Sequence, residues 1–118
     1  MSLPITCALT VLCVAANALI AIADYRRARF VSANAALVGV PPTAVPYLAT
    51  LKLTGALGLA AGLAGAPWLG LAAGAGLTAF FIGAIITHVR AHVLHNIAFP
   101  GVYLLLAIAS TVYFTGRP

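Results

Sequence analysis

Charged residues are scarce in this chain of 118 residues. Only 6% of its side chains are charged, and a single acid, Asp24, stands against six lysines and arginines. A soluble domain carries roughly 25% charged residues, so this inventory cannot build a surface that faces water. The chain is 64% hydrophobic, and its mean hydropathy is +1.13. The composition therefore excludes a soluble enzyme, a secreted disulfide scaffold and a disordered segment, and it indicates a membrane protein.

Cysteines and metal ligands are also few. Cys7 and Cys13 fall in one apolar run, roughly 9 Å apart along a helix axis and on different faces, so they cannot form a disulfide. His88, His92 and His95 share a helical face if the helix continues that far, but a closed zinc site needs a fourth ligand and supporting groups. We expect no metal site, and interpret the histidines as a solvated or headgroup-binding patch.

The net charge of +5 raises the question of nucleic acid as a partner. The positive charges, however, do not form a stripe along a soluble face. Arg26, Arg27 and Arg29 cluster in one loop, as arginines do beside a membrane with anionic lipids. We therefore expect membrane lipid as a partner and no nucleic acid.

Four apolar runs are each long enough to cross a membrane, because a span needs roughly 20 apolar residues. Turn-forming stretches separate them, among them Gly39-Val40-Pro41-Pro42 and Ala64-Gly65-Ala66-Pro67. We expect residues 1–118 to form one transmembrane domain, an all-α integral membrane four-helix bundle. The spans are predicted at 3–23, 44–63, 68–88 and 97–114.

The first span lacks the basic start of a signal peptide, so we expect it to be retained, although Ala21-Ile22-Ala23 resembles a cleavage site. Residues 26–38 follow it and predict a short interfacial helix whose arginines lie among the headgroups. The apolar residues that we expect against the membrane are Phe30, Val31, Leu37 and Val38.

The distribution of lysine and arginine predicts the orientation, because loops rich in these residues stay in the cytoplasm. The loops 24–43 and 88–96 lie on one side and hold four of the five arginines. The other side holds the N-terminus, the 64–67 turn and Arg117. We therefore expect both termini to be extracytoplasmic.

Small residues recur where helices must touch. Gly58 and Gly62 form a GxxxG pattern in the second span, and Gly70 and Gly74 repeat it in the third. Helices associate in lipid by close backbone approach, which small residues permit. The second and third spans should pack as a tight antiparallel pair. This pattern predicts packing and no chemistry.

A few polar side chains fall within the spans. Lys52 lies on the order of 12 Å below the cytoplasmic side, where a charged lysine costs up to about 3 kcal/mol on insertion scales. At a similar level on the other helices, or close to it, are Asn17, Thr54, His88 and Tyr103. They predict a polar pocket in the cytoplasmic half of the bundle. The alternative is that the Lys52 side chain extends to the headgroups, and that its polar neighbours only hydrogen-bond to it.

Proton transfer on an apolar molecule is the chemistry left to these residues, because one acid cannot supply paired carboxylates. The catalytic candidates are Lys52, His88, Tyr103 and Asp24. The ligand-binding candidates in the same layer are Asn17 and Thr54. Arg90 faces the opposite way from His88 and is expected to contact a lipid phosphate or Asp24.

Several segments resemble one known family. They are Leu51-Lys52-Leu53-Thr54-Gly55-Ala56-Leu57-Gly58-Leu59, the hairpin with Pro67 and Leu69-Gly70, Gly83-Ala84-Ile85-Ile86-Thr87-His88-Val89-Arg90-Ala91, and Gly39-Val40-Pro41. In order and spacing they are similar to the DoxX-like family, over about residues 8–112. The resemblance implies a compact four-helix bundle in a bacterial cytoplasmic membrane, associated with redox functions, since a thiosulfate:quinone oxidoreductase subunit gave the family its name.

The resemblance also implies site residues. The polar positions that match the family are Lys52, Thr87, His88 and Arg90, which adds Thr87 and Arg90 to the ligand-binding candidates. An acid often found in the second helix of relatives has no counterpart here, so a shared acid–base mechanism is not implied.

Three functions follow as hypotheses. The first is a membrane redox protein that binds a quinone or another isoprenoid-like ligand near Lys52 and His88. The second is a small membrane isomerase or cyclase that uses the same residues for proton transfer. The third is a non-catalytic assembly subunit that associates through its GxxxG faces. We also expect a homo-oligomer or a larger membrane complex.

Overall fold

The computed structural model describes residues 2–116. These residues form five α-helices and one 3-10 turn, and no strand occurs among them. The elements are α1 (Leu3–Tyr25), α2 (Arg29–Leu37), η1 (Pro42–Ala44), α3 (Val45–Leu63), α4 (Pro67–Arg90) and α5 (Ala98–Thr115). The helices α1, α3 with η1, α4 and α5 are long and apolar enough to cross a membrane. The predicted all-α, four-span fold is confirmed.

The helix boundaries follow from proline and glycine. Pro4, Pro46 and Pro67 lie in the first turns of α1, α3 and α4, where a missing N–H costs no helical hydrogen bond. Gly39 and Gly65 have φ angles of 78° and 128° in the connections on either side of α3, a conformation that glycine adopts without strain. The helices end within two residues of the predicted spans.

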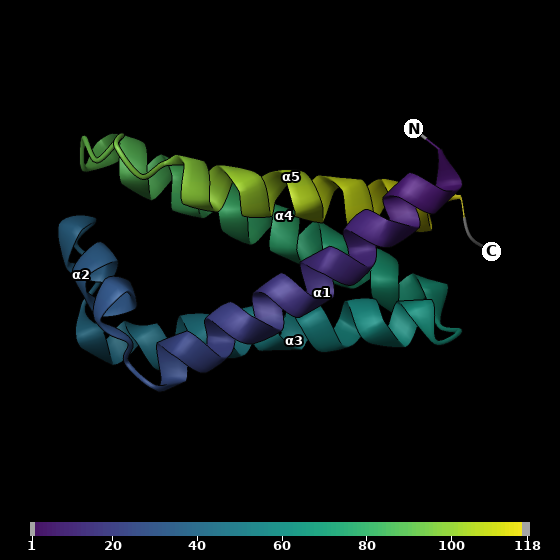
Figure 1. Cartoon of the computed structure of the whole chain (residues 1–118), viewed down its shortest axis with the longest axis horizontal. Coiled ribbons are helices and arrows are strands. Elements are labelled where there is room, and N and C mark those ends of the chain that lie inside the picture. The colour runs from purple at the N-terminus through teal and green to yellow at the C-terminus, as the bar shows by residue number, and fades with distance from the viewer. Residues whose placement is uncertain (1, 117–118) are drawn as a thin grey trace.

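The four spans form a ring, in which α1 and α4 each pack against both α3 and α5. Figure 1 shows α1 running obliquely, from the α5 side at one end of the bundle to the α3 side at the other. The start of α1 and the end of α5 therefore lie at the same end (Figure 1), and α2 lies across the opposite end. At the α2 end, α1 has diverged from α5.

The core is apolar and tightly packed along α3 and α4. Its buried residues are Cys13, Leu59, Leu77, Phe81, Leu106, Ala107 and Phe114. A Cβ added to Gly62 would lie 2.6 Å from the Cα of Gly70, and one added to Gly58 would lie 2.6 Å from the Cβ of Ala73. The expected close antiparallel pairing of these two helices is thus confirmed. Gly58 and Gly62 therefore serve a helix contact within the chain.

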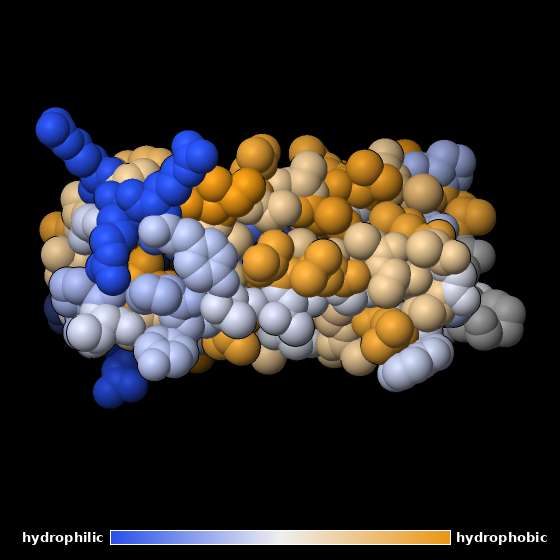
Figure 2. Space-filling model, turned by 90° about the horizontal axis from the view of Figure 1, so that it is seen from below, coloured by the Kyte–Doolittle hydropathy of each residue, from blue (hydrophilic) through white to orange (hydrophobic). Residues whose placement is uncertain are grey.

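The outer surface is apolar over most of its length. Figure 2 shows hydrophilic side chains gathered at the α2 end, with mainly apolar side chains over the rest of this face. The exposed Arg26, Arg27 and Arg29 belong to the connection between α1 and α2 and to the start of α2. Arg117, which enters the orientation argument, lies outside the described residues. An apolar band with a basic end is the surface that a lipid bilayer requires.

The short helix between the first two spans is confirmed, but part of its predicted face is wrong. Phe30 and Leu37 are 55% and 51% exposed, whereas Val31 is only 9% exposed and packs against Ile20 and Val45. The reason is that α2 lies over the space between diverging helices, so its apolar side finds protein partners. A membrane-facing position for Val31 therefore does not hold.

Candidate functional site

A cavity of about 560 Å³ lies at the α2 end of the bundle. Its walls come from all five helices and are mostly aliphatic and aromatic. The polar residues that line it are Asp24, Asn34, Lys52, Thr87, His88, Asn96 and Tyr103. A volume of several hundred cubic ångströms with apolar walls and a few polar groups is typical of small-molecule sites.

An ion pair forms one polar wall. Asp24 is in the last turn of α1, and Lys52 is in the middle of α3, which packs alongside. The Lys52 Nζ lies 2.5 Å from the Asp24 Oδ2, and the two side chains are only 12% and 5% exposed. The same Nζ lies 5.9 Å from the centre of the Phe80 ring. Because each charge is removed from water, each depends on the other for stabilisation.

Two contacts were expected for Arg90, with a lipid phosphate or with Asp24, and the one with Asp24 does not occur, because Asp24 pairs with Lys52. Arg90 is exposed at the end of α4. No ion pair between the two is found in residues 2–116. The pairing with Lys52 is favoured because both residues face the cavity from neighbouring helices.

His88 supplies a buried hydrogen-bond acceptor. Its side chain lies in the last turn of α4, is 5% exposed and lines the cavity. Its Nδ1 lies 2.9 Å from the carbonyl oxygen of Ala84. A carbonyl oxygen only accepts, so Nδ1 is the donor, and Nε2 of the neutral ring carries a lone pair. This Nε2 is buried and without a partner among residues 2–116.

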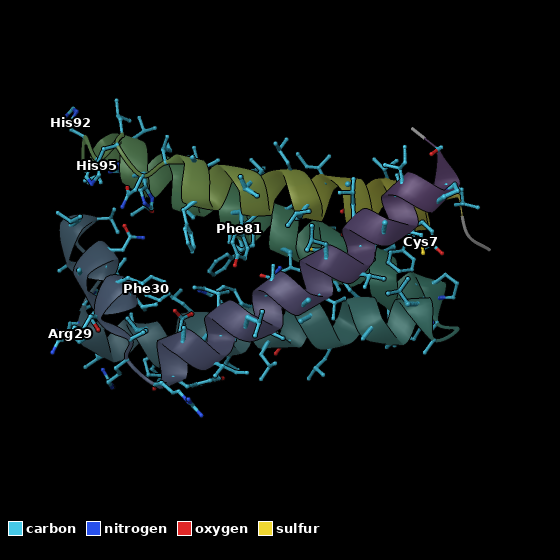
Figure 3. The ribbon with its side chains drawn as sticks, viewed as in Figure 1. Cys7, Arg29, Phe30, Phe81, His92 and His95 are labelled. Carbon is cyan, nitrogen blue, oxygen red and sulfur yellow. The ribbon has the colours of Figure 1, made fainter. Side chains whose placement is uncertain are left out.

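Aromatic rings form another part of the cavity wall. The Phe99 and Tyr103 rings are stacked, with centroids 5.3 Å apart and planes at 17°, and Phe81 lies 5.2 Å from Tyr103. The Tyr103 hydroxyl donates to the carbonyl oxygen of Ala16, 3.1 Å away, which fixes the ring. Figure 3 shows Phe81 between the α4–α5 pair and the α1–α3 pair, and Phe30 on the inner side of α2. The cavity therefore offers flat apolar surfaces.

Two asparagines connect α2, which lies across the end of the cavity, to the segment before α5. Asn96, before α5, donates through Nδ2 to the Oδ1 of Asn34 on α2. The Oδ1 of Asn96 is buried and has no partner in the described part of the chain. The link holds α2 across the end of the cavity and leaves a second unpaired acceptor there.

The structure brings most of the predicted site residues together. The predicted residues that line the cavity are Asp24, Lys52, Thr87, His88 and Tyr103. Three others lie elsewhere. Asn17 is fully buried in the core and donates to the carbonyl oxygen of Cys13. Thr54 is exposed and donates to the carbonyl oxygen of Thr50. Arg90 is exposed at the end of α4.

His92 and His95 are separate from the cavity. The helix α4 ends at Arg90, and His92 has a φ of 58°, so the chain has left the helical path. Both histidines are exposed, and Figure 3 shows them at the tip of the bundle beyond α4. Within residues 2–116, no three histidine, cysteine, aspartate or glutamate side chains are grouped as metal ligands.

Several cavity residues were not singled out as site residues from the sequence. They are Phe30, Asn34, Phe80, Phe99 and Asn96. Phe99 and Tyr103 are four residues apart on one helix face, which is a signal for a shared wall. The asparagines carry no such signal, because their pairing joins segments 62 positions apart.

Comparison with known proteins gives one match. The model of the DoxX-like family matches residues 8–110, a range that contains every residue lining the cavity. No curated protein and no solved structure matches the chain significantly.

Proposed function

The chain belongs to the DoxX-like family of membrane proteins, and from this premise we propose that it binds a quinone or another hydrophobic, isoprenoid-like molecule in a redox-related role. The observation that carries the proposal is the cavity of about 560 Å³, with its apolar walls and its buried polar groups. A ligand that partitions into the bilayer reaches such a site without crossing water.

The walls suit a molecule with a flat polar head and an apolar tail. The stacked pair of Phe99 and Tyr103 and the neighbouring Phe81 offer faces and edges to a ring. Lys52 supplies a hydrogen-bond donor and His88 an acceptor for polar groups on the ring, and the aliphatic lining from α2 and α3 accommodates the tail. Stacking and a few polar contacts fix the orientation of ligands in sites of this kind.

Mass spectrometry of the organic extract from gently purified protein tests the proposal. We expect a near-stoichiometric quinone or isoprenoid in the wild type, and strongly reduced amounts in His88→Ala and Phe99→Ala, which alter the cavity wall. Arg90→Ala is the matched control, because Arg90 is exposed near His88 and does not line the cavity. Bulk phospholipid alone, unchanged in every folded variant, contradicts ligand binding.

A second candidate is a proton-transfer enzyme, an isomerase or cyclase. It is favoured by one observation: Asp24, Lys52, His88 and Tyr103 all line the same cavity. Such an enzyme exchanges a carbon-bound hydrogen of its substrate with solvent. An isoprenoid incubated with the protein in heavy water should gain deuterium with the wild type and not with His88→Ala. No gain above a protein-free control rules this candidate out for the isoprenoid used.

We further propose a location in the bacterial cytoplasmic membrane, with the α2 end in the cytoplasm and both termini outside. The exposed arginines at the α2 end support this orientation, because they favour the cytoplasmic side. A homo-oligomer or larger complex remains part of the proposal. It would need a surface other than Gly58 and Gly62, which pack against α4 within the chain.

A further inference from the structure

Hydrogen-bond donors in the cavity wall are largely committed to protein acceptors. The Tyr103 hydroxyl donates to the carbonyl oxygen of Ala16, and the Thr87 hydroxyl donates to that of Gly83 at 2.8 Å. The Lys52 ammonium is ion-paired with the Asp24 carboxylate and keeps N–H groups that point elsewhere. The wall donors left for a ligand are therefore the Lys52 ammonium and the Nδ2 of Asn34, whose Oδ1 alone is paired among residues 2–116.

Acceptors in the same wall are left unpaired. The Nε2 of His88 and the Oδ1 of Asn96 are both buried without partners among residues 2–116, and both residues line the cavity. The bond from Nδ1 to Ala84 fixes the tautomer of His88 from within its own helix. In the neutral ring its Nε2 is therefore an acceptor, with or without a ligand. Buried polar atoms are rarely left unpaired in proteins, so a ligand that donates a hydrogen bond fits here.

We propose that the cavity selects a ligand whose aromatic head carries a hydroxyl group, as in a phenol or in the reduced quinol form of a quinone. The hydroxyl donates to the His88 Nε2, and the ring packs along Phe99 and Tyr103. An oxidised quinone presents only carbonyl oxygens, whose lone pairs face the lone pair of Nε2. Lys52 can donate to the oxygen of either form and does not discriminate between them. This inference rests on the proposed function and deepens it.

Equilibrium binding to purified wild-type protein in detergent, under anaerobic conditions, tests the selectivity. The probes are decylhydroquinone, its dimethyl ether, the corresponding quinone, and farnesol, which has a hydroxyl without a ring. We expect decylhydroquinone to bind about tenfold more tightly than the ether and the quinone, as one buried hydrogen bond provides. It should also bind more tightly than farnesol.

His88→Phe keeps a flat ring and removes the acceptor, so it should bind the hydroquinone and its ether within about twofold of each other. Arg90→Ala is the control, because Arg90 is exposed on the same helix and does not line the cavity, and it should keep the preference. If His88→Phe does not fold, the four-probe comparison on the wild type decides alone.

Equal binding of the three ring probes to the wild type overturns the selectivity and leaves the proposed function standing. A preference that survives in His88→Phe also overturns the role of Nε2, and farnesol binding at least as tightly as the hydroquinone overturns the aromatic head. If no probe binds to folded wild-type protein, the proposed function fails, and this inference fails with it.

Discussion

Lys52 and Asp24 are opposite charges in the part of the protein that a bilayer surrounds, and each is stabilised mainly by the other. Their side chains are 12% and 5% exposed, and their charged atoms are 2.5 Å apart. Removing one partner leaves a buried charge without compensation, whereas removing both leaves none. The pair therefore contributes to stability chiefly as a unit, whatever further role it has towards a ligand.

A double-mutant cycle on this pair should be strongly non-additive. We expect Lys52→Met and Asp24→Leu each to lower the free energy of unfolding by about 3–5 kcal/mol, and the double variant to lose far less than the sum. Reversible unfolding in mixed detergent micelles measures all four proteins. Losses that simply add would mean that the two charges are stabilised independently, by water or by other groups.

At the residue scale, the level of a residue along its helix was predictable and the direction of its side chain was not. The level follows from the residue number, which predicts a similar level for Lys52, His88 and Tyr103, and all three line the same cavity. Direction depends on rotation about the helix axis and on packing. Thr54 is two residues beyond Lys52, roughly 200° around the helix. It therefore turns away from the cavity and is exposed.

At the element scale, the four spans were predictable because hydropathy and turn residues are local properties of the chain. The role of α2 was not, since it depends on how α1 diverges from α5, a helix that is far from α2 in sequence. Val31 shows this: an apolar residue beside arginines suggests a membrane face, but it packs between Ile20 and Val45. The short helix that was predicted as an interfacial element forms a wall of the cavity.

The contact between α3 and α4 gives an element-scale prediction with a matched control. A methyl group on Gly62 would lie 2.6 Å from the Cα of Gly70, whereas one on Gly76 of α4 meets nothing within 4 Å. We expect Gly62→Ala to destabilise the protein by about 1–3 kcal/mol through overpacking against backbone. Gly76→Ala should not lose stability, because alanine also favours the helix. Unfolding in mixed micelles compares the two, and equal stabilities contradict a close backbone contact here.

At the scale of the whole molecule, the even number of spans places the start of α1 and the end of α5 at one end of the bundle, and the arginine-rich α2 region at the other (Figure 1). Basic loops stay in the cytoplasm, so the direction of insertion depends on the charges at the α2 end. In the proposed orientation the cavity lies in the cytoplasmic half of the membrane, close to α2.

Cysteine labelling of intact cells measures this orientation. In a background of Cys7→Ser and Cys13→Ala, a single cysteine is placed at Ser32 on α2 or at Ala64 in the turn after α3, both of which are exposed. We expect a membrane-impermeant maleimide to label Ala64→Cys in intact cells, and Ser32→Cys only after permeabilisation. The reverse pattern would place α2 and its arginines outside the cell. It would mean that the lysine and arginine bias does not direct the insertion of this protein.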